Sequence, residues 1–121
     1  MDHVTGIGGV FLKAKDPKAM TAWYEKYLGI PFGENLYVAY PWNDPQGNTV
    51  FSFFKQESKY FDPSTSPVML NLRVRNLTEL LAKLKQDGVW VDEKTENAEY
   101  GKFGWTMDPE GNKIELWEPA G

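Results

Sequence analysis

The chain repeats one succession of elements, and the two copies lie about 60 residues apart. In the first copy, Asp16 and Pro17 form a typical helix start, apolar residues follow at helical spacing, and Gly29 stands where a left-handed residue would end the helix. In the second copy, Asn76 takes the capping place of Asp16, a stripe of leucines follows, and Gly88 stands at the end. The match predicts two helices and constrains the fold to two similar halves.

Alternating apolar residues around these helices predict strands. In each half one strand precedes the helix, and two strands flank a turn of the form Asp-Pro-X-Gly-Asn, at 44–48 and 108–112. The predicted strands are 7–14, 36–42 and 49–55 in the first half, and 68–74, 101–107 and 113–117 in the second. Each half is predicted to run strand, helix, then about three strands, two of which flank the turn.

We therefore expect an α+β fold in a single domain, residues 1–121, made of two tandem βαβββ modules. Module 1 spans about 4–55, module 2 spans about 68–118, and the polar segment 56–67 connects them. A helix would cover one sheet face in each module, so the other faces must be shielded by each other or by a partner. This predicts a curved mixed sheet forming a cup, and a homodimer that covers the faces and edge strands left open.

Composition excludes several functions. The chain has 13 basic and 17 acidic residues, a net charge of −4 that disfavours nucleic acid as a partner. It has no cysteine, which rules out disulfides, thiolate nucleophiles and cysteine-ligated zinc. The first nine residues do not resemble a signal peptide, and no apolar run approaches a membrane span, so we expect a cytoplasmic protein without membrane contact. Five Trp, six Tyr and seven Phe predict a pocket or interface lined with rings.

Several motifs together resemble those of the vicinal oxygen chelate superfamily, which includes glyoxalase I, bleomycin-resistance and fosfomycin-resistance proteins and extradiol dioxygenases. The motifs are Asp16-Pro17, Trp23-Tyr24, Leu28-Gly29, Tyr100-Gly101, Asp108-Pro109-Glu110-Gly111-Asn112 and Ile114-Glu115-Leu116. They are turns, caps and core positions, so the resemblance implies a glyoxalase/bleomycin-resistance-like fold more than any one activity.

The resemblance also implies four places for the ligands of a divalent metal ion, on the first and last strands of each half. These places hold Gly9, Met69, Glu115 and, in the last strand of the first half, Phe51 or (after a one-residue slip) Ser52. Only Glu115 is a suitable donor, and one carboxylate does not hold a catalytic ion where about three protein ligands are the rule. The single histidine, His3, is expected to be an ordinary tail residue. We therefore expect no metal and no other cofactor.

Glu115 alternates with Ile114 and Leu116, which look core-facing, so Glu115 is expected to point into the cup and is the candidate catalytic base. The residues expected to line a ligand site with it are Phe11, Met69, Asn71, Arg73, Tyr100, Phe103, Trp105 and Trp117. An alternative is that Arg73 and Glu115 only form an ion pair between neighbouring strands. The aromatic residues Trp23 and Tyr24 lie on a helix stripe and are expected to be core residues.

These observations predict a metal-free protein that binds a small, partly aromatic or cationic molecule in an aromatic cup, for binding, sequestration or resistance. One alternative is an enzyme of the same superfamily, of lyase, isomerase or dioxygenase type, that uses Glu115 as base or metal ligand. Another is a structural or regulatory dimer whose cup is vestigial.

Overall fold

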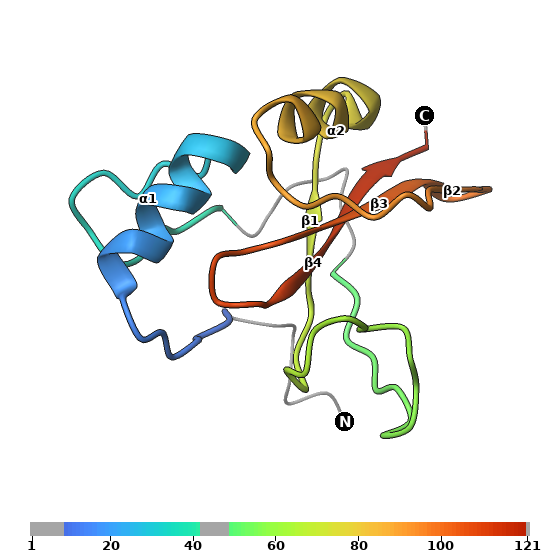
Figure 1. Cartoon of the computed structure of the whole chain (residues 1–121), viewed down its shortest axis with the longest axis horizontal. Helices are drawn as coiled ribbons and strands as arrows, with labels where there is room; N and C mark the ends of the chain where they lie inside the picture. Colours follow the sequence, from blue (N-terminus) through green and yellow to red (C-terminus); the bar gives the residue numbers. More distant parts are fainter. Residues whose placement is uncertain (1–8, 42–48, 121) are drawn as a thin grey trace.

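The protein is represented by a computed structural model, which describes residues 9–41 and 49–120. Its elements are α1 (Pro17–Leu28), β1 (Leu70–Arg73), α2 (Leu77–Gln86), β2 (Glu96–Ala98), β3 (Gly101–Met107) and β4 (Lys113–Pro119). The strands form one mixed sheet in the order β1-β4-β3-β2, in which β1 runs parallel to β4 and the other neighbours are antiparallel (Figure 1). The fold class is therefore α+β, as predicted.

Both helices pack on one face of this sheet. β4 alternates between this face, to which Ile114 and Leu116 point with no exposed surface, and the opposite face. The core joins these two side chains to residues on one stripe of each helix, namely Met20, Tyr24, Leu77, Leu81 and Leu84. Burial of Tyr24, with Trp23 packed beside it, confirms that the aromatic stripe of α1 belongs to the core.

The ends of α1 form as predicted. The Asp16 side chain accepts a hydrogen bond from the Ala19 N–H at 3.1 Å, Pro17 occupies the first helical position, and Gly29 is left-handed with φ 71°. The N-terminus of α2 differs from the prediction, because Asn76 itself is left-handed and its side chain makes no capping hydrogen bond. The Glu118 carboxylate accepts from the Leu77 N–H instead, at 2.7 Å. The cap of α2 thus comes from β4, which the repeat could not predict.

Helix α1 is fastened to the β3–β4 turn by side chains. The Tyr24 hydroxyl donates to the buried Asp108 carboxylate at 2.8 Å. At the other end of the turn, the Glu110 carboxylate accepts from the backbone N–H groups of Lys15 and Asp16 at 2.9 and 3.0 Å. These two backbone hydrogen bonds lower the pKa of Glu110. The first-half helix is therefore held by the second-half turn.

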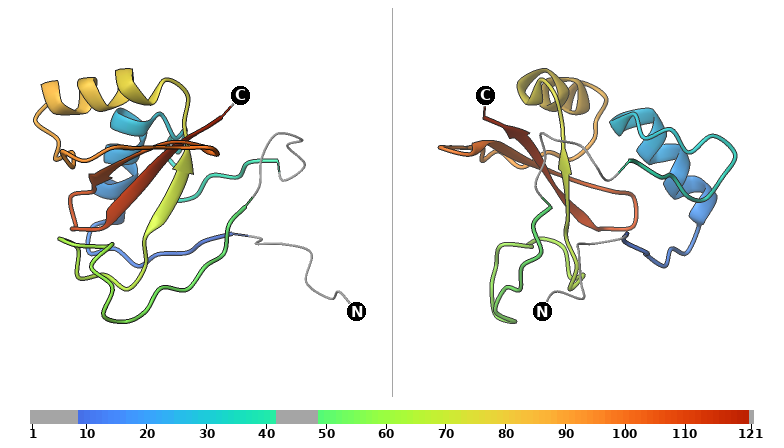
Figure 2. Two further views of the ribbon diagram at one scale, coloured as in Figure 1. Left: turned by 90° about the vertical axis from the view of Figure 1, so that its right-hand side faces the viewer. Right: turned by 180° about the vertical axis from the view of Figure 1, so that it is seen from behind.

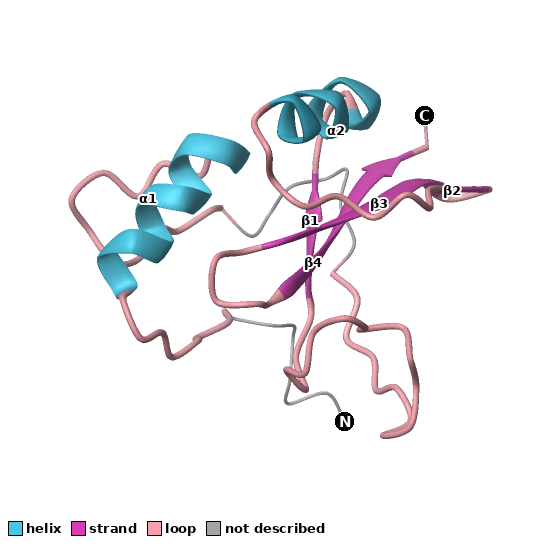
Figure 3. Cartoon of the chain, in the orientation of Figure 1, coloured by secondary structure: helices cyan, strands magenta, loops and turns pink. Residues whose placement is uncertain are grey.

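The first-half strands were predicted wrongly as far as the structure describes them. The segments 9–14, 36–41 and 49–55 lie in loops and pair with no strand (Figure 3). The remaining residues of those predicted strands, 7–8 and 42, and the turn at 44–48 lie outside the described residues. Only module 2 forms its sheet, so the cup of two modules is not built by the described part of one chain. Within that part, neither helix has the length and apolar character needed to cross a membrane.

Candidate functional site

The sheet face away from the helices carries the candidate site residues in two rows across the strands. The first row runs Asn71, Glu115, Trp105, because β4 pairs with β1 on one side and with β3 on the other. The second row, two residues along, holds Arg73, Trp117 and Phe103. Residues paired in this way share one face of a sheet, so the alternation predicted from sequence brings six of the nine candidates together.

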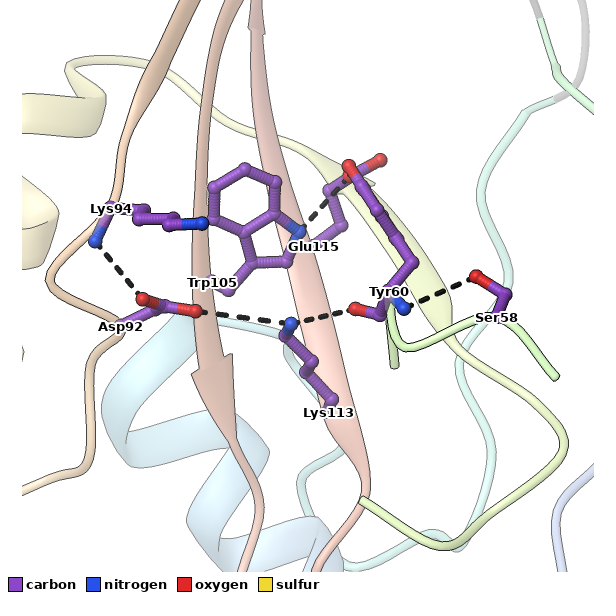
Figure 4. A network of polar contacts seen from close by, with 7 residues as sticks. All are labelled: Ser58, Tyr60, Asp92, Lys94, Trp105, Lys113 and Glu115. Carbon is purple, nitrogen blue, oxygen red and sulfur yellow. Dashed lines mark hydrogen bonds and ion pairs between the residues drawn. The ribbon is translucent and has the colours of Figure 1, made fainter. Parts of the chain in front are cut away.

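Glu115 is the centre of the first row, and three uncharged groups donate hydrogen bonds to its carboxylate. The Asn71 side-chain amide donates to Oε1 at 2.7 Å, and the Trp105 indole N–H donates to Oε2 at 3.0 Å. The Tyr60 hydroxyl donates to the same Oε2 (Figure 4). The carboxylate is half-buried and is held by donors from β1, β3 and the connector.

Tyr60 was missed by the sequence analysis, which treated 56–67 as a connector only. Figure 2 shows the green segment that contains Tyr60 on the side of the sheet opposite to α2. Its ring meets Trp105 edge-on with centroids 5.8 Å apart and stacks on Phe54 at 5.2 Å. The connector therefore forms part of the wall of the candidate site.

Lys113 was also missed, although a sequence signal existed. It lies two residues before Glu115 in β4, so the same alternation that turns Glu115 toward this face also turns Lys113 toward it. Its ammonium group donates to the Tyr60 carbonyl at 2.8 Å and pairs with Asp92 at 3.9 Å. It also lies 5.6 and 5.5 Å from the ring centres of Tyr60 and Trp105, as Figure 4 illustrates. Only 7% of its side chain is exposed, so Lys113 is a buried residue that links β4 to the connector.

The pKa of the Tyr60 hydroxyl is raised above its usual value of 10.0. Burial is the largest cause, and the hydrogen bond to Glu115 and the charge of that carboxylate follow. Tyr60 therefore remains protonated, and remains a hydrogen-bond donor, throughout the neutral pH range.

Two members of the second row are stacked aromatic rings. Phe103 and Trp117 are parallel, with centroids 6.0 Å apart and an interplanar angle of 1°, and Tyr100 meets Phe103 edge-on at 5.7 Å. The Trp117 indole N–H donates to the Tyr100 carbonyl at 2.9 Å. Gly101 makes this approach possible, because its φ is 136° and a Cβ there would lie 2.2 Å from the Glu118 carbonyl oxygen. Because Gly101 lets the backbone pass this close to β4, the Tyr100 ring lies beside Phe103 and forms part of the aromatic wall.

Besides Tyr100, which joins the second row through Phe103 and Trp117, two of the predicted lining residues lie outside these rows. Phe11 lies in the loop before α1 with 97% of its surface exposed. Met69 directly precedes β1 and is half-buried. For Phe11 the reason is that the strand expected over 7–14 is not formed by its described residues, so nothing turns this side chain toward Glu115.

The alternative of a bare ion pair receives no support from the contacts of Glu115. Its two oxygens take hydrogen bonds from neutral donors, and Asn71 is its partner across β1 and β4. Arg73 stands opposite Trp117, one row away.

The residues at the four metal places do not fit a divalent ion. Gly9, Phe51 and Ser52 lie in loops and not in the strands expected there, and Met69 offers only a thioether. Both oxygens of Glu115 already accept hydrogen bonds. Within 9–41 and 49–120, no three Asp, Glu, His or Cys side chains gather into a cluster that could hold a metal ion. His3 lies outside the described residues.

Two hollows in the described surface lie beside the candidate site. One of about 430 Å³ is lined by Phe54, Lys55, Glu57 and Ser58 in and next to the connector. Another of about 390 Å³ lies at the β2 edge, next to Gly101 and Glu118. Glu115 lines neither of them, and Tyr60 lies against its carboxylate.

Comparison with protein families gives one match of nearly full length. The model of the glyoxalase-like domain matches residues 9–117, which include both helices, the connector and all of the sheet except the last two residues of β4. A comparison with curated proteins finds no match. The matched stretch covers most of the chain and includes the turn at 108–112, which is one of the motifs that carry the resemblance. This chain therefore belongs to the family of glyoxalase-like domains, and with it to the vicinal oxygen chelate superfamily.

Proposed function

We propose that this protein binds a small, flat organic molecule that is cationic or polar and aromatic, on the wall around Glu115, in a binding, sequestration or resistance role. The observation that carries the proposal is a half-buried carboxylate, positioned by Tyr60, Trp105 and Asn71, beside a row of stacked rings. A few oriented polar groups among aromatic side chains are the usual composition of a small-ligand site.

The chemistry of this wall suits a cation. The faces of Trp117 and Phe103 offer stacking surface, and Glu115 offers a charge-assisted hydrogen bond to an N–H donor. The net charge of −4 adds a weak, long-range attraction for positively charged ligands.

We propose that binding needs no metal ion. This follows from the donor set at the four metal places, where Gly9, Phe51 or Ser52, and Met69 offer no suitable ligand beside Glu115. Elemental analysis of protein purified without chelator is expected to find no stoichiometric zinc, nickel, manganese or iron. About one ion per chain that is lost in Glu115→Ala would contradict this part of the proposal.

The rival function is an enzyme in which Glu115 takes a proton from a substrate. In the described geometry Oε2 already accepts from Tyr60 and Trp105, and Oε1 accepts from Asn71. Three of the about four accepting positions of the carboxylate are thus in use, which favours a holding role for Glu115 over a base. Turnover of a bound compound that is abolished in Glu115→Gln would favour the enzyme.

We also propose that the protein is a homodimer. The loops 9–14, 36–41 and 49–55 have strand-like sequences yet expose large apolar side chains, among them Phe53 with 88% of its surface exposed. Among the described strands β1 also lies at an edge of the sheet, a place where another chain can pair. A second copy that covers these surfaces would bury more than about 1,000 Å², as stable pairs do. Sedimentation that shows only monomer at micromolar concentration would contradict this proposal.

The binding proposal is tested by tryptophan fluorescence. Trp105 donates to the proposed anchor and Trp117 lies in the neighbouring row, so a bound aromatic compound is expected to quench their emission. Benzamidinium is a suitable first probe because it is flat, cationic and carries N–H donors. The proposal fails if benzamidinium and a diverse set of aromatic cations and polar aromatics give neither quenching nor a shift in melting temperature.

A further inference from the structure

We propose that the Tyr60 hydroxyl is an internal competitor at Oε2 of Glu115, which a ligand must displace to reach that oxygen. The inference rests on the binding function proposed above and adds a rule of selection to it. A ligand gains from this contact only if its donor is stronger than a phenol, as a cationic N–H group is.

Tyr60 is held at both ends and along its ring. Its hydroxyl donates to Glu115, its carbonyl accepts from Lys113 at 2.8 Å, and its backbone N–H donates to the Ser58 hydroxyl at 3.2 Å. Its ring contacts Trp105 and Phe54, and Figure 4 shows the hydroxyl lying directly at the Glu115 carboxylate. These contacts fix the hydroxyl at the position that a ligand donor would occupy.

Of the two donors on Oε2, Tyr60 is the one that can leave without disturbing the sheet. Trp105 is buried and belongs to β3, whose ladder with β4 fixes its backbone. Tyr60 lies in a turn of the connector, outside every strand. Its hydroxyl can therefore move away through a shift of the connector that leaves the ladders of the sheet unchanged.

The free energy gained when a ligand donor replaces the Tyr60 hydroxyl depends on the charge of the ligand. A hydrogen bond from a neutral donor to a carboxylate is replaced either by another neutral donor, with little net gain, or by a charged donor, which binds a carboxylate more strongly. Burial and the neighbouring carboxylate raise the pKa of Tyr60, so the competing proton is present at all physiological pH values. Lys113 is paired with Asp92, which reduces its repulsion of an incoming cation.

Two probes of one shape and two matched variants test the inference. The probes are benzamidinium, which is cationic, and benzamide, which is neutral. Tyr60→Phe removes the competing hydroxyl and keeps the ring, and Tyr27→Phe makes the same chemical change on α1, at the opposite face of the sheet. Affinities are measured by fluorescence titration, and the release of the connector in the wild-type protein is measured by hydrogen exchange of residues 58–64.

Tyr60→Phe is expected to bind benzamidinium roughly three- to tenfold more tightly than the wild type, the factor expected for removing one competing hydrogen bond. Tyr27→Phe is expected to match the wild type. In the wild type, benzamidinium is expected to speed exchange in 58–64 and benzamide is not. The exchange measurement needs no variant, so it decides the inference even if Tyr60→Phe folds poorly.

The inference and the binding function fail in different ways. Wild-type binding of benzamidinium that is unchanged or weakened in Tyr60→Phe, or that slows exchange in 58–64, overturns the competitor and leaves the binding function standing. The absence of binding to both proteins overturns both. Tight binding to Tyr60→Phe alone supports both, because the wild-type site is then closed by its own tyrosine.

Discussion

The two halves of this chain have similar sequence patterns and different structures. In the second half, the strands pair with one another and all the predicted elements form. In the first half only α1 forms among the described residues, and the segments with strand-like patterns expose their apolar side chains. An alternating pattern therefore forms a strand only where a neighbouring strand is available to pair with it.

The second half supplies its own partners through local connections. β3 and β4 are joined by the turn at 108–112, in which Asp108 accepts from the Glu110 and Asn112 backbone N–H groups at 2.9 and 3.0 Å. This hairpin then offers β4 to β1. In the first half, α1 is held by the second-half turn, while the flanking loops find no ladder among the described residues.

The largest expected effect separates the two halves by their stability. Leu116→Ala, in the core of the second half, is expected to lower the free energy of unfolding by about 2–5 kcal/mol, because Leu116 has no exposed surface and its loss leaves a cavity. Phe51→Ala, at a side chain that is 72% exposed, is expected to change it by less than about 0.5 kcal/mol in dilute protein.

Urea unfolding measures both variants. Equal losses of unfolding free energy in Leu116→Ala and Phe51→Ala would contradict the difference between the halves. A loss in Phe51→Ala that appears only as protein concentration rises would sharpen it, by placing the first-half loops in the proposed dimer interface.

The next effect concerns the bond that links the halves. Tyr24→Phe removes the donor to buried Asp108 and is expected to cost about 1–3 kcal/mol of unfolding free energy. Tyr27→Phe on the same helix is the control, since it is only half-buried, and should cost less than about 0.5 kcal/mol. If Tyr24→Phe is as stable as the control in chemical denaturation, the bond to Asp108 does not hold α1 on the turn.

The smallest effect is a pH dependence of the same junction. The pKa of Glu110 is lowered from its usual 4.5 by the N–H groups of Lys15 and Asp16, so its contribution to stability is present above that value and is lost as pH falls through the folded pKa. Glu110→Gln is expected to flatten the fall in stability between about pH 6 and pH 3. Identical pH profiles of the variant and the wild type would show that this carboxylate does not couple α1 to the turn.

The sequence predicted those parts of the fold that depend on neighbours in the chain. The bounds of β3 were predicted from alternation and the start of β4 from the turn before it, and the caps of α1 from Asp16 and Gly29. Asn76 was predicted wrongly as a side-chain cap because the repeat carried over a residue type, while Glu118 of β4 provides the acceptor. That contact joins distant segments, which no local pattern encodes.

The candidate site likewise contains residues that the local sequence pattern predicts and one that it does not. Glu115, Trp105 and Asn71 could be placed on one face from the period of two residues in strands, and Lys113 could have been found by the same rule. Tyr60 could not, because it reaches Glu115 from a loop 55 positions away in the chain. A tyrosine in a polar connector carries no signal of the sheet that it covers.

The central claim is that Glu115 anchors a ligand and is not merely a satisfied inward charge. Glu115→Gln tests it, because the new side-chain oxygen can still accept from Tyr60 and Trp105 while the amide of Asn71 turns to accept from the new NH₂ group. The fold is therefore expected to keep its unfolding free energy to within about 1 kcal/mol.

The most direct measurement is the calorimetric affinity of benzamidinium and benzamide for the wild type and for Glu115→Gln. The account predicts that the variant binds the cation more weakly by about 1–3 kcal/mol, the value of a charge-assisted hydrogen bond, and binds the neutral probe nearly as before. A variant that loses several kcal/mol of stability, from a wild type that binds neither probe, would contradict the account and would leave Glu115 a structural residue of the sheet.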